Sequence, residues 1–129
     1  MDIPDQIAAA MGLRVDELPV PTDWPNGLWI PDQHRIILRH DMDWITHRCT
    51  LAHEIGHAHH RHELTGIPHL DARMERQADA FAALILIGAR EYATAEREHG
   101  PHTGALAHAL DVTPHYIRVW RGHHERTPA

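Results

Sequence analysis

A five-residue run near the middle of the chain, His53-Glu54-Ile55-Gly56-His57, combines residue types that can do chemistry with a metal ion. Two histidines four positions apart on a helix project from one face about one turn apart, which suits two imidazole nitrogens sharing one zinc ion. Glu54 lies beside the first histidine, where a carboxylate can act as general base toward a water molecule. The spacing therefore predicts two zinc ligands, His53 and His57, and a general base, Glu54.

The competing interpretation is a solvated, histidine-rich helix face, because 15 of the 129 residues are His. The apolar side chains of Leu51, Ala52, Ile55 and Ala58 oppose it, since they make this helix half-buried. Gly56 costs a helix interior about 1 kcal/mol relative to Ala. Its presence in the motif therefore predicts that another element packs closely against this turn.

A catalytic zinc site needs a third protein ligand and one open position. The extended pattern HExxHxxGxxH does not supply it, because His60 and Glu63 occupy its last two defining positions. His60 itself shares a face with the first two histidines, but three ligands on one straight helix do not easily converge on one ion. The remaining candidate is Glu75, on the next predicted helix.

Asp79 follows Glu75 by four residues and is the only polar residue between Ala78 and Ile87. A carboxylate in such an apolar stretch is costly unless it is paired or hydrogen-bonded. We therefore expect Glu75 to bind the metal and Asp79 to accept a hydrogen bond from the non-metal nitrogen of a ligand histidine. The alternative, an exposed pair of helix acids, suits Glu75 but explains Asp79 poorly.

The elements that must position these side chains can be read from the apolar periodicity. It predicts helices over residues 3–13, 43–62 and 70–87, and two shorter helices over 103–110 and 114–121. Three prolines make residues 19–25 an irregular connection. Gly27-Leu28-Trp29-Ile30, a turn at 31–33 and the β-branched run that follows predict a hairpin.

This pattern predicts an α+β fold in which a small antiparallel sheet, the hairpin, packs on a helical body that carries the motif helix, with a C-terminal helical pair. The length suits a single domain over residues 1–129. We expect the metal in a cleft between the motif helix and the hairpin, whose outer strand could pair with an extended substrate.

Composition limits the class of protein. The hydrophobic content of 43% is that of a folded domain, and the net charge of −6 gives no basic stripe for nucleic acid. A single cysteine, Cys49, excludes an intrachain disulfide and reads as a buried small hydrophobe. The first ten residues lack the signal-peptide pattern, and the longest apolar run, 80–87, is too short to span a membrane. We therefore expect a cytoplasmic protein without membrane contact.

Two segments, LAHEIGHAHHRH (51–62) and ERQADAFAALIL (75–86), together resemble the ImmA/IrrE family of metallopeptidases, within the wider gluzincin group. The signature of that family is an HExxH helix followed by an E-x-x-A-N/D-x-F-A helix. All defining positions of the second motif are matched, by Glu75, Ala78, Asp79, Phe81 and Ala82. The resemblance covers about residues 27–120.

The resemblance implies a zinc-dependent intracellular endopeptidase of restricted specificity. Members are often carried by phages and mobile elements, where they cleave a helix-turn-helix repressor and release silenced genes. The expected cofactor is Zn²⁺, and the expected partner is a transcriptional repressor in the host cytoplasm. Two other classes stay open: a catalytically idle zinc protein that acts as an interaction or regulatory module, and a small DNA-binding regulator.

The segment over about 103–121 also has the appearance of a helix-turn-helix. One interpretation is DNA contact through Arg118 and Arg121; the other is a structural pair that closes the core. The acidic chain favours the second.

The intact Glu54 favours the peptidase over the idle zinc protein. A transition-state oxyanion would need a hydrogen-bond donor beside the metal. The candidates in the sequence are Tyr92, His69 and Tyr116, and the sequence alone does not distinguish among them.

Overall fold

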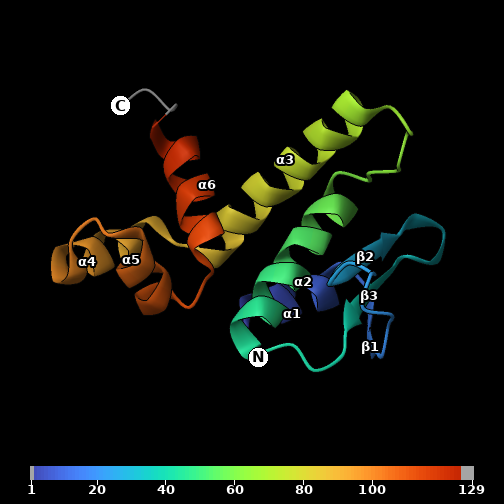
Figure 1. Cartoon of the computed structure of the whole chain (residues 1–129), viewed down its shortest axis with the longest axis horizontal. Coiled ribbons are helices and arrows are strands. Elements are labelled where there is room, and N and C mark those ends of the chain that lie inside the picture. The colour runs from blue at the N-terminus through green and yellow to red at the C-terminus, as the bar shows by residue number, and fades with distance from the viewer. Residues whose placement is uncertain (1, 126–129) are drawn as a thin grey trace.

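The computed structural model describes residues 2–125, and within them the chain forms six α-helices and one three-stranded sheet. The elements in chain order are α1 (Ile3–Ala10), β1 (Arg14–Leu18), β2 (Gly27–Ile30), the 3-10 turn η1 (Pro31–Gln33), β3 (Arg35–Arg39), α2 (Trp44–His59), α3 (Pro68–Leu86), α4 (Ala89–His99), α5 (Thr103–Leu110) and α6 (Pro114–Glu125). Figure 1 shows α2 and α3 side by side, with the sheet against α2 and the last three helices around the end of α3. The predicted α+β class is confirmed.

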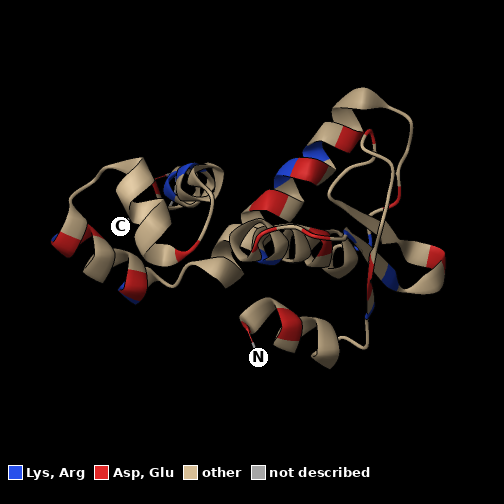
Figure 2. Cartoon of the chain, turned by 60° about the horizontal axis from the view of Figure 1, so that its bottom comes forward, with Lys and Arg blue, Asp and Glu red and all other residues tan. Residues whose placement is uncertain are grey.

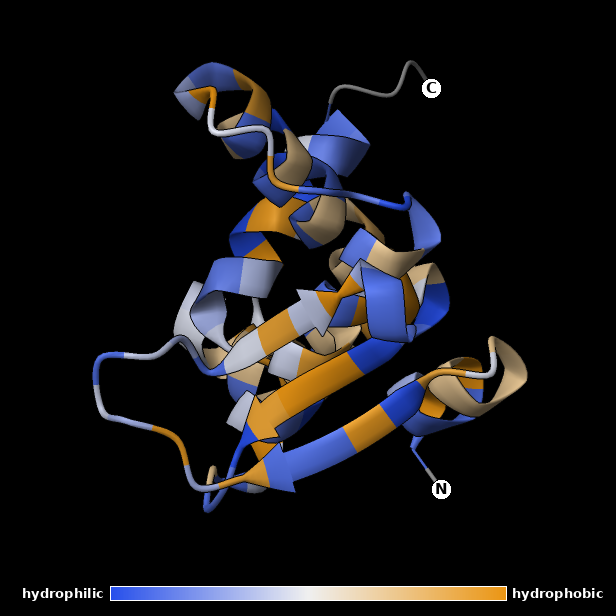
Figure 3. Ribbon diagram, turned by 90° about the vertical axis from the view of Figure 1, so that its right-hand side faces the viewer, coloured by the Kyte–Doolittle hydropathy of each residue, from blue (hydrophilic) through white to orange (hydrophobic). Residues whose placement is uncertain are grey.

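The sheet contains the predicted hairpin, β2 and β3, and also a parallel strand that we did not predict. The strand order is β1-β3-β2, with β1 parallel and β2 antiparallel to the central strand. β3 is the most hydrophobic of the three (Figure 3), whereas β1 lies at an edge and exposes or half-exposes all its side chains. Because the apolar pattern of β1 is weak, its strand conformation depends on pairing with β3, which lies further along the chain.

The helix boundaries differ from the predicted ones mainly at the ends. α2 begins after Asp43, which caps it by accepting from the Thr46 N–H at 2.9 Å. It ends at His59 instead of residue 62, because Arg61 adopts a left-handed conformation with φ 54°. α4 was not predicted, since its sequence is mostly polar and only Tyr92 and Ala95 are buried.

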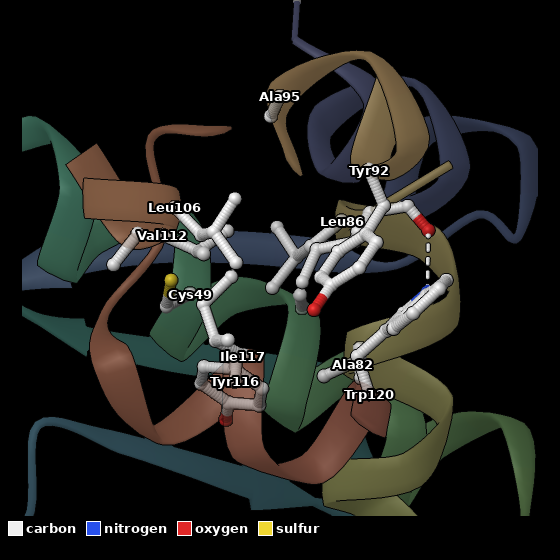
Figure 4. Packing of buried hydrophobic residues seen from close by; sticks show 14 residues of the cluster. Cys49, Ala82, Leu86, Tyr92, Ala95, Leu106, Val112, Tyr116, Ile117 and Trp120 are labelled. Atoms are coloured by element: carbon white, nitrogen blue, oxygen red, sulfur yellow. Dashed lines mark hydrogen bonds between the residues drawn. The ribbon is translucent and has the colours of Figure 1, made fainter. Parts of the chain in front are cut away.

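Two clusters of buried hydrophobic side chains lie on opposite sides of α2. One cluster joins α1 and the sheet to α2, through Ala8, Ile36, Leu38, Leu51 and Ile55. The other joins α2 and α3 to the last three helices, and Figure 4 shows side chains from α5 and α6 pointing into it beside Leu86 and Tyr92. The motif helix is therefore held from both sides, so its position relative to sheet and α3 is set by packing.

The C-terminal pair, α5 and α6, packs into the core, as the structural interpretation of this segment expects. Leu106, Ile117 and Trp120 are buried in the second cluster. Arg121 donates to the Tyr92 hydroxyl at 2.7 Å and to Thr103 at 2.9 Å, and it also contacts the Pro101 carbonyl. The guanidinium of Arg121 is thus occupied within the protein.

Charged side chains do not separate into a basic face along the longest helix. Figure 2 shows acidic and basic residues interleaved along α3. Among the described residues, no helix has the length and apolar character that crossing a membrane requires.

Candidate metal centre and active-site cleft

The close approach of α2 and α3 at Gly56 positions the site. A Cβ atom at Gly56 would lie 2.7 Å from the carbonyl oxygen and 2.9 Å from the Cα of Ala78. Only glycine allows two helix backbones to come this close. The predicted close packing at Gly56 is confirmed, and it places the α3 carboxylates opposite the motif histidines.

The three predicted ligands converge on one point. His53 Nε2 lies 2.8 Å from Glu75 Oε2, His57 Nε2 lies 3.0 Å from Glu75 Oε1, and the two Nε2 atoms are 3.2 Å apart. Zinc bonds of about 2.0–2.1 Å at tetrahedral angles would separate neighbouring ligand atoms by about 3.3 Å. These residues form the one group of at least three His, Cys, Asp or Glu side chains in residues 2–125 that could hold a metal ion.

Asp79 lies behind His53, as the apolar surroundings of this carboxylate led us to expect. His53 Nδ1 is 2.7 Å from Asp79 Oδ1, which also accepts from the Tyr116 hydroxyl at 3.1 Å. His115 Nε2 lies 2.8 Å from the other carboxylate oxygen. Burial raises the pKa of Asp79, but the bonds from His53 and His115 outweigh it and lower the pKa overall. Asp79 is therefore ionised and orients His53.

The two motif histidines differ in protonation when no metal is present. Burial lowers the pKa of His53, but the bond to Asp79 and the charges of Glu54, Asp79 and Glu75 together raise it to about 9. Burial, together with the neighbouring histidines, lowers the pKa of His57. At neutral pH without metal, His53 is therefore the positively charged imidazolium of the pair, and His57 is the neutral imidazole.

Glu54 has the surroundings expected of a general base. It is 6% exposed, and its Oε2 is a buried side-chain atom without a hydrogen-bond partner within the described chain. Burial raises the pKa of Glu54 to about 7. An unpartnered buried carboxylate oxygen is costly, so this atom fits a site that a water molecule and a metal ion complete.

The strand β2 lies directly over Glu54. A Cβ atom at Gly27 would lie 2.7 Å from Thr50 Cγ2 and 2.8 Å from Glu54 Cγ. The Arg39 N–H donates to the Asn26 carbonyl at 2.8 Å. Asn26 and Arg39 are therefore a hydrogen-bonded pair, and hydrogen-bonded and non-hydrogen-bonded pairs alternate along two antiparallel strands. Gly27 and Trp29 belong to the non-hydrogen-bonded pairs, so their main-chain N–H and C=O groups point toward the free edge of β2.

A cleft of about 920 Å³ runs between β2, α2 and α3. The predicted ligands, the predicted base and Asp79 all line it, as do Leu28, Leu64 and Met74. Of the three oxyanion donors that the sequence offered, Tyr116 lines the cleft. Tyr92 is instead buried, bonds Arg121 and stacks on Trp120 with ring centroids 4.0 Å apart. His69 is exposed in the first turn of α3, outside the residues that line the cleft.

The structure also brings two residues to the site that the sequence reasoning missed. His62 Nδ1 lies 2.9 Å from His57 Nδ1, and His62 Nε2 lies 2.8 Å from Gln77 Oε1. We had placed His62 at the end of the motif helix, where a residue five positions after His57 would face elsewhere. The signal was absent because the contact depends on the reversal of the chain at Arg61.

The family model of the IrrE N-terminal-like domain, peptidase family M78, matches residues 8–118, which include both site helices and most of the C-terminal pair. A search of curated proteins found no match. Since the family match covers well over half of the chain, the protein belongs to the IrrE N-terminal-like family of M78 peptidases.

Proposed function

We propose that this protein is a zinc-dependent endopeptidase that acts in the cytoplasm on one or a few proteins. The observation that carries the proposal is the convergence of three ligand atoms beside the unpartnered, buried carboxylate oxygen of Glu54. Membership in a peptidase family supports the reaction class. The proposed substrate is a helix-turn-helix repressor of a phage or mobile element, as the motif resemblance suggests.

In the proposed reaction His53, His57 and Glu75 would hold the zinc ion, which supplies Lewis-acid polarisation of water and of the peptide carbonyl. Glu54 accepts a proton from the attacking water and passes it to the leaving amine. A carboxyl with a pKa of about 7 suits both transfers at neutral pH. Asp79 holds the proton of His53 on Nδ1 and so leaves the Nε2 lone pair free.

The substrate would bind as an extended segment along the free edge of β2. The Gly27 and Trp29 main-chain groups can pair with its backbone, as edge strands do. Tyr116 is the proposed donor to the oxyanion, because it lines the cleft. Its one hydroxyl proton, which Asp79 accepts in the substrate-free structure, would turn from Asp79 to the oxyanion.

The first expected result concerns metal content. Purified protein should carry about one zinc per chain, and Glu75→Ala should lose most of it because one of three protein ligands is gone. Elemental analysis measures both. Glu63→Ala is the matched control, since Glu63 is an exposed glutamate of the same cleft outside the ligand group. Full zinc occupancy in Glu75→Ala would remove Glu75 from the site.

The same zinc measurement should depend on pH with a defined sign. Without metal, His53 keeps its proton up to a pKa of about 9, and zinc must displace that proton. Affinity should therefore rise about tenfold per pH unit between roughly pH 6 and 8, with about one proton released per zinc. Calorimetry in buffers of different ionisation enthalpy counts the proton. An affinity that is constant across this range would contradict the protonation of His53.

A third expected result concerns the substrate. Co-expression with candidate helix-turn-helix repressors, taken first from the genes that flank its own, should give a discrete cleavage product from one of them, whereas unrelated cytoplasmic proteins stay intact. The matched control is the Glu54→Gln variant expressed in the same way. Broad degradation by the wild type would contradict restricted specificity. Failure of the zinc-loaded protein to cleave any candidate would favour the idle zinc-binding module.

A further inference from the structure

The ring of His57 has a second nitrogen, and the chain supplies a partner for it. We infer that His62, with Gln77 behind it, is a positioning residue that fixes the ring orientation and the tautomer of His57 for metal binding. This inference rests on the proposed zinc site. It concerns the protein's own hydrogen bonds, so it can be tested without measuring cleavage.

The direction of the hydrogen bonds follows from which nitrogen of His57 faces the ligand group. Its Nε2 lies 3.0 Å from Glu75 Oε1 and 3.2 Å from His53 Nε2, so Nε2 is the nitrogen on the metal side. A nitrogen that binds a metal offers its lone pair, and the proton of the neutral ring must then lie on Nδ1. His57 Nδ1 therefore has to donate, and the acceptor within reach is His62 Nδ1 at 2.9 Å.

The next bond in the chain has the polarity that this donation needs. Once His62 Nδ1 accepts, the proton of the neutral His62 ring lies on Nε2. That nitrogen is 2.8 Å from Gln77 Oε1, and an amide oxygen only accepts. His57 Nδ1 therefore donates to His62 Nδ1, and His62 Nε2 donates to Gln77 Oε1, so both hydrogen bonds have one donor and one acceptor.

His62 is itself held by the elements that form the cleft. Its N–H donates to the His57 carbonyl at 3.0 Å, and its own carbonyl accepts from Trp29 Nε1 at 3.2 Å. Its ring stacks on His60, with centroids 5.2 Å apart and planes 16° apart. Contacts from α2 and β2 therefore hold the backbone of His62, and His60 and Gln77 hold its ring.

The arrangement makes the two histidine ligands unequal. His53 donates to an ionised carboxylate, whereas His57 donates to a neutral imidazole backed by an amide. A charged acceptor strengthens the ligand in front of it more than a neutral one does. The role of His62 is accordingly orientation and tautomer choice, with little electrostatic gain.

The test compares zinc affinities by competition with a chromophoric chelator. His62→Phe keeps a ring of similar shape and removes both nitrogens, and we expect zinc to bind about 10- to 100-fold more weakly. His60→Phe is the matched control, because this neighbouring ring belongs to the same stack but bonds no ligand, and its affinity should stay within about twofold of wild type. Gln77→Leu should weaken binding, and Gln77→Glu, which keeps the acceptor, should not.

Unchanged affinity in His62→Phe would overturn the inference, and so would an equal loss in His60→Phe. Zinc binding by the wild type is measured first. If the wild type binds no zinc, the proposed function is wrong as well. If the wild type binds zinc and His62→Phe binds it equally well, only the role of His62 is wrong. If a variant fails to fold, a measurement on the wild-type protein still tests the inference. Nitrogen NMR of the zinc-loaded protein should show a proton on His57 Nδ1 coupled across the hydrogen bond to His62 Nδ1. A proton on His62 Nδ1 would overturn the inference.

Discussion

Replacing Glu54 by Gln is expected to leave zinc bound and to slow peptide cleavage by about 10²-fold or more. The amide keeps the size and shape of the side chain but cannot take a proton from water. Glu54 is separate from the three ligand atoms, so the metal should stay. Since Glu54 is buried with a pKa raised to about 7, the neutral amide resembles its protonated form. The melting temperature should therefore not fall.

The measurement pairs zinc content with the rate of cleavage of the same substrate. Glu63→Gln provides the matched control, because it makes the same chemical change at an exposed position of the cleft. That variant should cleave at close to the wild-type rate. If Glu54→Gln cleaves as fast as wild type, the assignment of Glu54 as general base is wrong. If it loses its zinc, the separation of base from ligands is wrong.

Replacing Gly56 by Ala is expected to destabilise the protein and to weaken its metal site together. The new Cβ would lie 2.7 Å from the carbonyl oxygen of Ala78, a backbone atom that cannot rotate away. Such overpacking costs about 1–3 kcal/mol. The overpacking cost should exceed the gain of about 1 kcal/mol in helix propensity that Ala has over Gly. As α3 moves away, Glu75 and Asp79 separate from His53, and zinc affinity should fall at least about tenfold.

Urea unfolding of the metal-free protein and chelator competition measure the two effects separately. Gly122→Ala is the matched control, since a Cβ in that turn of α6 would meet nothing within 4 Å. This control should raise the free energy of unfolding by about 0.5–1 kcal/mol and leave zinc affinity unchanged. Wild-type stability and affinity in Gly56→Ala would show that α2 and α3 tolerate a larger separation.

The C-terminal helices have a structural part in the site as well as in the core. Tyr116 and His115, at the start of α6, both bond the carboxylate of Asp79. Ile117 and Trp120 anchor the same helix in the core below. The segment with a helix-turn-helix appearance is thus joined through Asp79 to His53, and its packing bears on the orientation of a ligand.

The sequence by itself determined those parts of the site that depend on helix periodicity. The spacing of His53 and His57 places both rings on one face, and Gly56 indicated a close neighbour before that neighbour was known. Asp79 was identified because a carboxylate in an apolar stretch needs a partner, and the structure places His53 there. Each of these signals is local, since α-helical geometry follows directly from residue spacing.

Only the tertiary structure decided the features that depend on residues far apart or on a change of chain direction. β1 forms a strand by pairing with β3, about 20 residues along the chain, so its own weak pattern did not predict it. The left-handed residue Arg61 turns His62 back onto His57, and helical spacing could not anticipate that contact. Packing of α6 on α3 brings Tyr116 to the cleft and leaves Tyr92 in the core. For β1 and Tyr116 the physical reason is the same: packing brings together elements that are far apart in the sequence, and local residue spacing does not encode such contacts. For His62 the reason is the change of chain direction at Arg61.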